Sequence, residues 1–93
     1  MVRWKASHIL VKKHSQALEL LDKIKKGANF GELAGENSMC PSKKRGGSLG
    51  WFSPGQMVKP FENAVKNMKK GEVTGPVKTQ FGYHIIKLDD KAG

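Results

Sequence analysis

The sequence predicts an α+β domain with a small, mainly antiparallel sheet. Strand-like alternation and helix-like spacing of apolar residues follow one another in the order strand, helices, strand, helix, strand, strand. A chain of 93 residues has room for one hydrophobic core, so residues 1–93 are expected to form a single domain. Its composition, 38% hydrophobic and 27% charged, is too apolar for a disordered tail and too polar for a membrane protein.

Four segments are expected to be strands. Apolar and polar residues alternate over residues 2–13, which predicts a strand largely covered on one face, with His8 on the apolar face. A short apolar strand is expected at residues 49–52. Two further strands are expected at residues 73–79 and 83–88, around a turn, and His84 lies in phase with the aliphatic residues of the second.

Two helices are expected between the first and second strands. Ser15 is the expected N-cap of the first helix, and Gly27 the residue that terminates it. Asn29 is expected to cap the second, with Glu32 in capping-box register. The expected apolar positions are Ala17, Leu18, Leu20, Leu21 and Ile24 in the first helix and Phe30, Leu33 and Ala34 in the second.

The middle of the chain predicts an irregular loop and then a third helix. Residues 39–50 hold one proline, three glycines and three adjacent cations without periodicity, which indicates a long loop. Loops of this length in small domains are often functional. The third helix is expected to have Pro60 in its first turn and to close at residues 69–71.

The chain is strongly basic. It carries 17 Lys and Arg against 8 Asp and Glu, a net charge of +9, and this field attracts polyanions. The lysines are therefore expected either to form an ordinary solvated surface or to recruit an anionic membrane surface or acidic proteins. No specific nucleic-acid partner is expected, because the aromatic residues do not interleave with the basic clusters as a stacking platform requires.

A single cysteine, Cys40, allows no internal disulfide, and no long apolar run marks a secretory signal or membrane span. We therefore expect a cytoplasmic protein, with a peripheral position at a membrane surface as the other expectation. Cys40 lies beside three cations, which would favour a thiolate if they pointed at it. With two histidines it is compatible with a thiol hydrolase or with an incomplete zinc site, but neither signature is present, and an inert half-buried thiol fits equally well.

Two further groups of residues are candidates for a site. His8 and His84 each precede an aliphatic residue by two positions on an inward face, so their rings can meet if the first and last strands are neighbours. Such a pair is satisfied best as two neutral, hydrogen-bonded rings, and this is also how ordinary core histidines behave. The residues Leu49, Phe52, Met57, Phe61 and Phe81 can form an apolar cup for one aliphatic ring, or simply belong to the core.

Several ordered motifs resemble the single-domain parvulins, which are peptidyl-prolyl cis/trans isomerases. The motifs cover nearly the whole chain: SHILVK at 7–12, GANF at 27–30, CPS at 40–42, RGGSLG at 45–50, GQMVKPF at 55–61 and GPVKTQFGYHII at 75–86. The resemblance implies a four-stranded antiparallel sheet surrounded by about four helices, in the order β-α-α-α-β-α-β-β. It also implies that the protein is a monomer without cofactor or metal and that its partners are proline-containing polypeptides.

The resemblance also assigns roles to residues. It implies that His8 and His84 form a dual-histidine motif with Thr79 bonded into it, that Cys40 is the active-site loop residue, and that Leu49, Met57, Phe61 and Phe81 form the proline pocket. Some parvulins carry aspartate in place of Cys40, which implies an electrostatic role for this residue. Only residues 12–14 span the gap where phosphate-directed members have a long basic loop, so selectivity for phosphoserine is not expected. The other expectation is a catalytically weak module that binds proline-containing segments or anionic surfaces.

Overall fold

Four antiparallel strands form one sheet in the spatial order β2-β1-β4-β3. The computed structural model describes residues 2–93. Its elements, in chain order, are β1 (Arg3–Val11), α1 (His14–Lys25), α2 (Phe30–Asn37), the 3₁₀ helix η1 (Pro41–Arg45), β2 (Ser48–Phe52), α3 (Lys59–Lys66), β3 (Val73–Thr79) and β4 (Gly82–Ala92). This order confirms the predicted fold class, with η1 as the third helical element.

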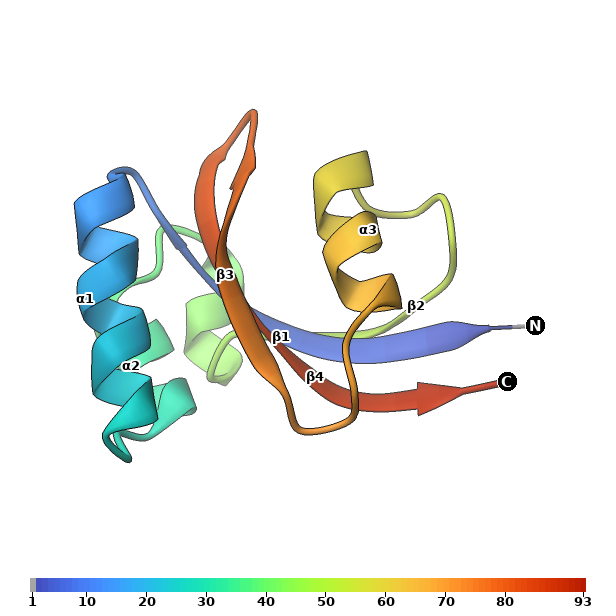
Figure 1. Cartoon of the computed structure of the whole chain (residues 1–93), viewed down its shortest axis with the longest axis horizontal. Coiled ribbons are helices and arrows are strands. Elements are labelled where there is room, and N and C mark those ends of the chain that lie inside the picture. The colour runs from blue at the N-terminus through green and yellow to red at the C-terminus, as the bar shows by residue number, and fades with distance from the viewer. Residues whose placement is uncertain (1) are drawn as a thin grey trace.

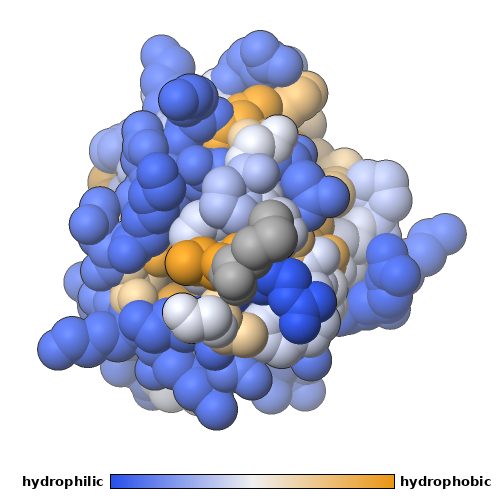
Figure 2. Space-filling view, turned by 90° about the vertical axis from the view of Figure 1, so that its right-hand side faces the viewer, coloured by the Kyte–Doolittle hydropathy of each residue, from blue (hydrophilic) through white to orange (hydrophobic). Residues whose placement is uncertain are grey.

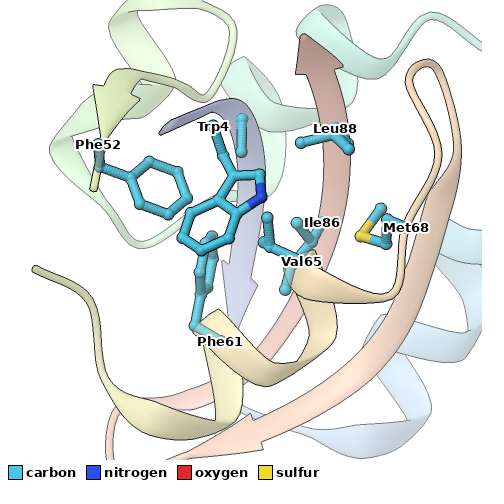
Figure 3. Packing of buried hydrophobic residues seen from close by; sticks show 8 residues of the cluster. Trp4, Phe52, Phe61, Val65, Met68, Ile86 and Leu88 are labelled. Atoms are coloured by element: carbon cyan, nitrogen blue, oxygen red, sulfur yellow. The ribbon is translucent and has the colours of Figure 1, made fainter. Parts of the chain in front are cut away.

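Helices cover both faces of the sheet. In Figure 1, α1 and α2 lie on one side of the strands and α3 lies on the other. One apolar cluster joins α1 and α2 to Ile9, Val11 and Ile85 of the two central strands. The second cluster joins α3 to the opposite face of the same strands and includes Trp4 (Figure 3); its buried members are Trp4, Ala6, Phe52, Phe61, Val65, Met68, Ile86 and Leu88. The sheet is thus the shared middle layer of two cores.

The expectation that the first strand is covered on one face was wrong. β1 lies between β2 and β4, and every residue from Ala6 to Ile9 is buried, although the side chains alternate between the two faces. An interior strand packed by helices on both sides needs apolar residues at both parities. Ile9 and Val11, which interrupt the polar parity in the sequence, are the residues that pack against α1 and α2.

The number of helices agrees with the number expected from the sequence, but their first and last residues differ from the expected ones. Asn29 caps α2 as expected, because its side chain accepts a hydrogen bond from the Glu32 amide at 2.9 Å. Ser15 does not cap α1: the helix begins one residue earlier, its N-cap is Lys13, and no side chain caps it. Of the apolar positions expected for α1, Leu18 is exposed. α3 ends at Lys66, before the expected residues 69–71.

Residues 39–50 are more ordered than the sequence indicates. They contain η1 and the first residues of β2, and Gly46 ends η1 in the left-handed conformation. Gly47 also has a positive φ of 86° and its carbonyl accepts a hydrogen bond from the His8 amide at 2.9 Å. A Cβ on Gly47 would collide with the His8 carbonyl oxygen. This glycine therefore allows the loop to lie directly against β1 at His8. At the other end of the chain, β4 runs four residues beyond the expected end of the last strand, to Ala92.

Candidate active site

Two hollows lie at different ends of the sheet in the described part of the chain. One, of about 510 Å³, lies beside the two chain ends and is lined by Trp4, Pro54, Lys66 and Lys91 among others; Figure 2 looks at this end, where hydrophobic surface is ringed by hydrophilic side chains. The other, of about 470 Å³, contains both candidate histidines. Only the second brings polar groups of catalytic type next to an apolar cavity, so we take it as the candidate site.

His8 and His84 meet at the floor of this pocket. β1 and β4 pair so that His8 lies opposite Ile86 and Leu10 opposite His84, which sets the two rings on the same face of the sheet, toward α3. The rings stack with centroids 5.0 Å apart, and their Nδ1 atoms are 2.9 Å apart, a hydrogen-bond distance. Phe61 of α3 contacts both rings edge-on. The juxtaposition expected from the sequence is therefore present.

Thr79 extends this hydrogen-bond chain. Its Oγ1 lies 2.7 Å from His84 Nε2 and accepts a hydrogen bond from the Phe81 amide. If the Thr79 hydroxyl donates its hydrogen to His84 Nε2, the single proton of the neutral His84 ring is on Nδ1, which donates to His8 Nδ1. The single proton of the neutral His8 ring is then on Nε2. His8 Nε2 is buried and has no hydrogen-bond partner among residues 2–93. The chain of bonds thus ends at an unpartnered nitrogen of a pocket-lining residue.

Burial keeps both imidazoles neutral. The pKa of His8 is lowered to about 4, first by desolvation and then by the proximity of His84. Desolvation also lowers the pKa of His84. Two rings that share one Nδ1–H bond cannot both be charged without repelling each other in a poorly solvated site. At pH 7 the pair is a fixed set of dipoles.

The apolar walls agree with the sequence in four of five residues. Leu49, Met57, Phe61 and Phe81 all line the pocket, whereas Phe52 packs in the core against Trp4 and Phe61. Phe81 is 56% exposed, so it forms the rim and not a deep wall. Sequence analysis missed five lining residues, which are Leu10, Met39, Pro41, Gln56 and Val58. Met39 and Pro41 were missed because nothing in the loop's pattern shows which of its residues turn inward.

Cys40 also lines the pocket, half-buried at the start of η1. A residue that sequence analysis missed, Ser38, holds it there: the buried hydroxyl oxygen of Ser38 accepts hydrogen bonds from the amides of Leu10 and Cys40. Neither histidine is hydrogen-bonded to the Cys40 thiol in the part of the chain that the structure describes. Nor do three His, Cys, Asp or Glu side chains come together there as a metal site would require. The site thus offers an apolar cup and a hydrogen-bonded polar wall.

Comparison with known proteins agrees with this geometry. The rotamase family described as the PPIC-type PPIase domain matches residues 8–90. The foldase protein PrsA of Geobacillus kaustophilus is 56% identical over 88 residues, which are 94% of this chain and 31% of that protein. The chain therefore spans about a third of the curated relative it matches.

Solved structures extend the likeness to the fold. A crystal structure of the peptidylprolyl isomerase PrsA from Bacillus anthracis superposes with a TM-score of 0.97 at 44% identity, covering 99% of this chain and 43% of that one. The solution structure of NmPin, the parvulin of Nitrosopumilus maritimus, has a TM-score of 0.84 at 50% identity and covers 95% of this chain and 96% of that one. Motifs, fold and family match agree over nearly the whole chain, which belongs to the parvulin-type peptidyl-prolyl cis/trans isomerases.

Proposed function

We propose that the 470 Å³ pocket holds the proline ring of a polypeptide and lowers the barrier to rotation about the preceding peptide bond. The observation that carries this proposal is one apolar pocket with a neutral, hydrogen-bonded histidine pair on its floor. Its size lies in the range of about 300 to 1,000 Å³ that is usual for small-ligand sites.

The chemistry needs no nucleophile and no cofactor. Amide resonance opposes rotation with a barrier of about 18–20 kcal/mol, and no covalent bond breaks when a prolyl peptide bond isomerises. The transition state has a twisted amide with less charge separation than the planar amide. A dry apolar cup therefore favours the twisted amide over the planar form. In the twisted amide the carbonyl and the nitrogen are no longer joined by resonance, and fixed polar groups can bind each of them.

We assign the roles of the site residues accordingly. Leu49, Met57, Phe61 and Phe81 bind the proline ring. Thr79, His84 and His8 form one hydrogen-bond chain that ends at the buried His8 Nε2 and holds the polar floor of the pocket in place. Cys40 acts from the opposite loop as a polar, non-covalent group.

The proposed clients are flexible or unfolded polypeptides with accessible Xaa-Pro bonds, so that the enzyme assists a slow folding step.

We propose no selectivity for phosphoserine, since β1 and α1 are joined through residues 12–13 alone. Residues 1–93 would act as one monomeric domain. We also propose a cytoplasmic site of action; cell fractionation with an antibody to the chain tests it. No helix in residues 2–93 is long and apolar enough to cross a membrane.

Prolyl-peptide exchange measured by NMR tests the proposed function. Met57→Ala removes apolar surface from the pocket wall, where Met57 is partly buried and packs on the edge of the core. A loss of about 1.5 kcal/mol of apolar contact corresponds to about a tenfold loss in kcat/KM. Leu18→Ala is the matched control, because Leu18 is exposed on α1, away from the pocket. Equal rates for the two variants would contradict the pocket assignment, and peptide binding without exchange would favour the binding module.

A further inference from the structure

A buried carboxylate lies next to the wall of the candidate pocket. Glu62 follows the pocket residue Phe61 on α3, and only 8% of Glu62 is exposed. It is the one buried Asp or Glu in the part of the chain that the structure describes. A carboxylate loses its hydration on burial, so such a group is stable only where it is paired and hydrogen-bonded. Glu62 does not itself line the pocket, and its partners indicate what it does instead.

The main partner of Glu62 is the loop of residues 53–58, which joins β2 to α3. Glu62 Oε1 accepts a hydrogen bond from the Gly55 amide at 2.6 Å, and Glu62 Oε2 lies 3.4 Å from Lys66 Nζ. The Gly55 amide holds the pKa of Glu62 below its usual value; burial acts in the opposite direction, and Lys66 and Lys59 lower the pKa further. The carboxylate is therefore charged at pH 7, and its bond to Gly55 is of the stronger, charge-assisted kind.

This hydrogen bond attaches the loop to α3. Within residues 2–93, the other hydrogen bonds of residues 53–57 join Ser53 to Gln56, so they shape the turn without fixing its position. Gly55, with a φ of 90°, is the residue at which the loop passes from one hollow to the other. Pro54 lines the hollow beside the chain ends. The three residues after Gly55 line the candidate pocket; they are Gln56, Met57 and Val58.

We propose that Glu62 is a positioning residue that holds the Met57 wall of the pocket at a fixed spacing from Phe61. This inference rests on the proposed function and adds a residue to its site. Phe61 is fixed by α3 and is 2% exposed, whereas Met57 is only partly buried against the same core. Because Glu62 is the neighbour of Phe61 on the helix and binds Gly55 of the loop, it ties the two walls together.

Displacement of one wall should weaken substrate binding more than it slows rotation. In the proposed function Met57 contacts the proline ring in the planar and the twisted amide alike. Loss of such a contact raises KM and leaves kcat nearly unchanged. A merely structural role for Glu62 would lower Tm and leave the KM of the folded molecules as it is. The effect on KM relative to kcat therefore separates the two roles.

Two substitutions distinguish the reach of Glu62 from its charge. Glu62→Gln keeps the length of the side chain and an oxygen that can accept the Gly55 hydrogen bond, but removes the charge. Glu62→Asp keeps the charge but is one methylene shorter, so the carboxylate withdraws from Gly55. With an Ala-Pro peptide, Glu62→Asp should raise KM about tenfold, as expected for loss of the Met57 contact, and Glu62→Gln less than about threefold. In both variants kcat should stay within about twofold. A KM for Glu62→Gln that equals or exceeds that for Glu62→Asp would overturn the proposal.

Matched variants on another element control for charge and side-chain length alone. Glu19 is exposed on α1, so neither Glu19→Gln nor Glu19→Asp should change KM. A second test uses Met57→Ala as the background. If Glu62 acts through Met57, Glu62→Asp should raise KM much less in this background than in the wild type, because the two residues serve one contact. Additive losses would refute the proposal.

The wild-type protein separates this inference from the proposed function. Absence of Ala-Pro exchange in the wild type would refute the proposed function itself. Exchange by the wild type, together with a lower Tm but unchanged KM in Glu62→Asp, would refute the positioning role alone and show that Glu62 only stabilises the fold.

Discussion

The two histidines depend on each other more than on solvent. Each ring is nearly fully buried, and within residues 2–93 the shared Nδ1–Nδ1 hydrogen bond is the only one made by the Nδ1 atom of either ring. Removal of one ring leaves the buried Nδ1 of the other ring without a partner, which lowers the free energy of unfolding by about 1–3 kcal/mol. Removal of both rings leaves no such nitrogen. The pair is therefore a structural unit as well as the floor of the pocket.

This dependence gives a pH prediction. The folded-state pKa of His8, about 4, lies below the value of about 6.5 expected in the unfolded chain. The unfolded state therefore binds more protons between these values, so the stabilisation is complete above about pH 6.5 and is lost as the pH falls toward 4. At about 1.4 kcal/mol per pKa unit, His8 contributes on the order of 3 kcal/mol. Urea unfolding between pH 7 and pH 4 measures it.

The double variant His8→Leu, His84→Leu is the control for this measurement, because carboxylates also titrate in the same range. Its unfolding free energy should fall less steeply below pH 6.5 than that of the wild type. Parallel curves for the two proteins would show that the histidines have the same pKa in the folded and unfolded states.

Substitution of Cys40 distinguishes an electrostatic from a covalent role. Cys40 is the N-cap of η1 and no side chain caps this helix. Aspartate there can accept hydrogen bonds from first-turn amides and keeps a polar group at the pocket wall. Cys40→Asp should therefore retain more kcat/KM than Cys40→Ala. Loss of activity in both variants, together with a thiol-linked peptide found by mass spectrometry, would instead establish covalent catalysis.

At the scale of elements, the position of η1 and β2 against β1 depends on Gly47. Both Gly47 and Gly50 have a positive φ, so alanine at either position costs about 1–2 kcal/mol of backbone strain. Only Gly47 approaches the His8 carbonyl, whereas a Cβ on Gly50 would meet nothing within 4 Å. Gly47→Ala should thus lower stability by more than Gly50→Ala and also reduce kcat/KM, because it displaces the loop from His8. Thermal unfolding and peptide exchange on the two variants check this, and equal losses would contradict it.

Elements with a strong periodic pattern were predictable from the sequence, and the close approaches between elements were not. The range of β3, the Asn29 cap and the facing histidines follow from local pattern plus the pairing of the first and last strands. Met39, Ser38 and Gly47 belong to the site through contacts across many residues of sequence. No local period encodes such contacts. The burial of β1 on both faces was missed for the same reason, since it depends on which strand lies in the middle of the sheet.

At the scale of the whole molecule, the net charge opposes folding. The chain has 17 Lys and Arg but only 8 Asp and Glu, so the excess positive charges repel one another in the folded state. The three ion pairs of residues 2–93 neutralise few of these cations. Screening by a neutral salt should therefore raise Tm between about 20 and 300 mM, as the Debye length falls to a few ångströms. One kcal/mol of relief corresponds to about 4–8 °C for a domain of this size.

The Lys23→Glu, Lys25→Glu, Lys26→Glu triple brings the net charge from +9 to +3, since each reversal removes two units. Its Tm should depend less on salt than that of the wild type, and an equal dependence would mean that repulsion does not limit stability.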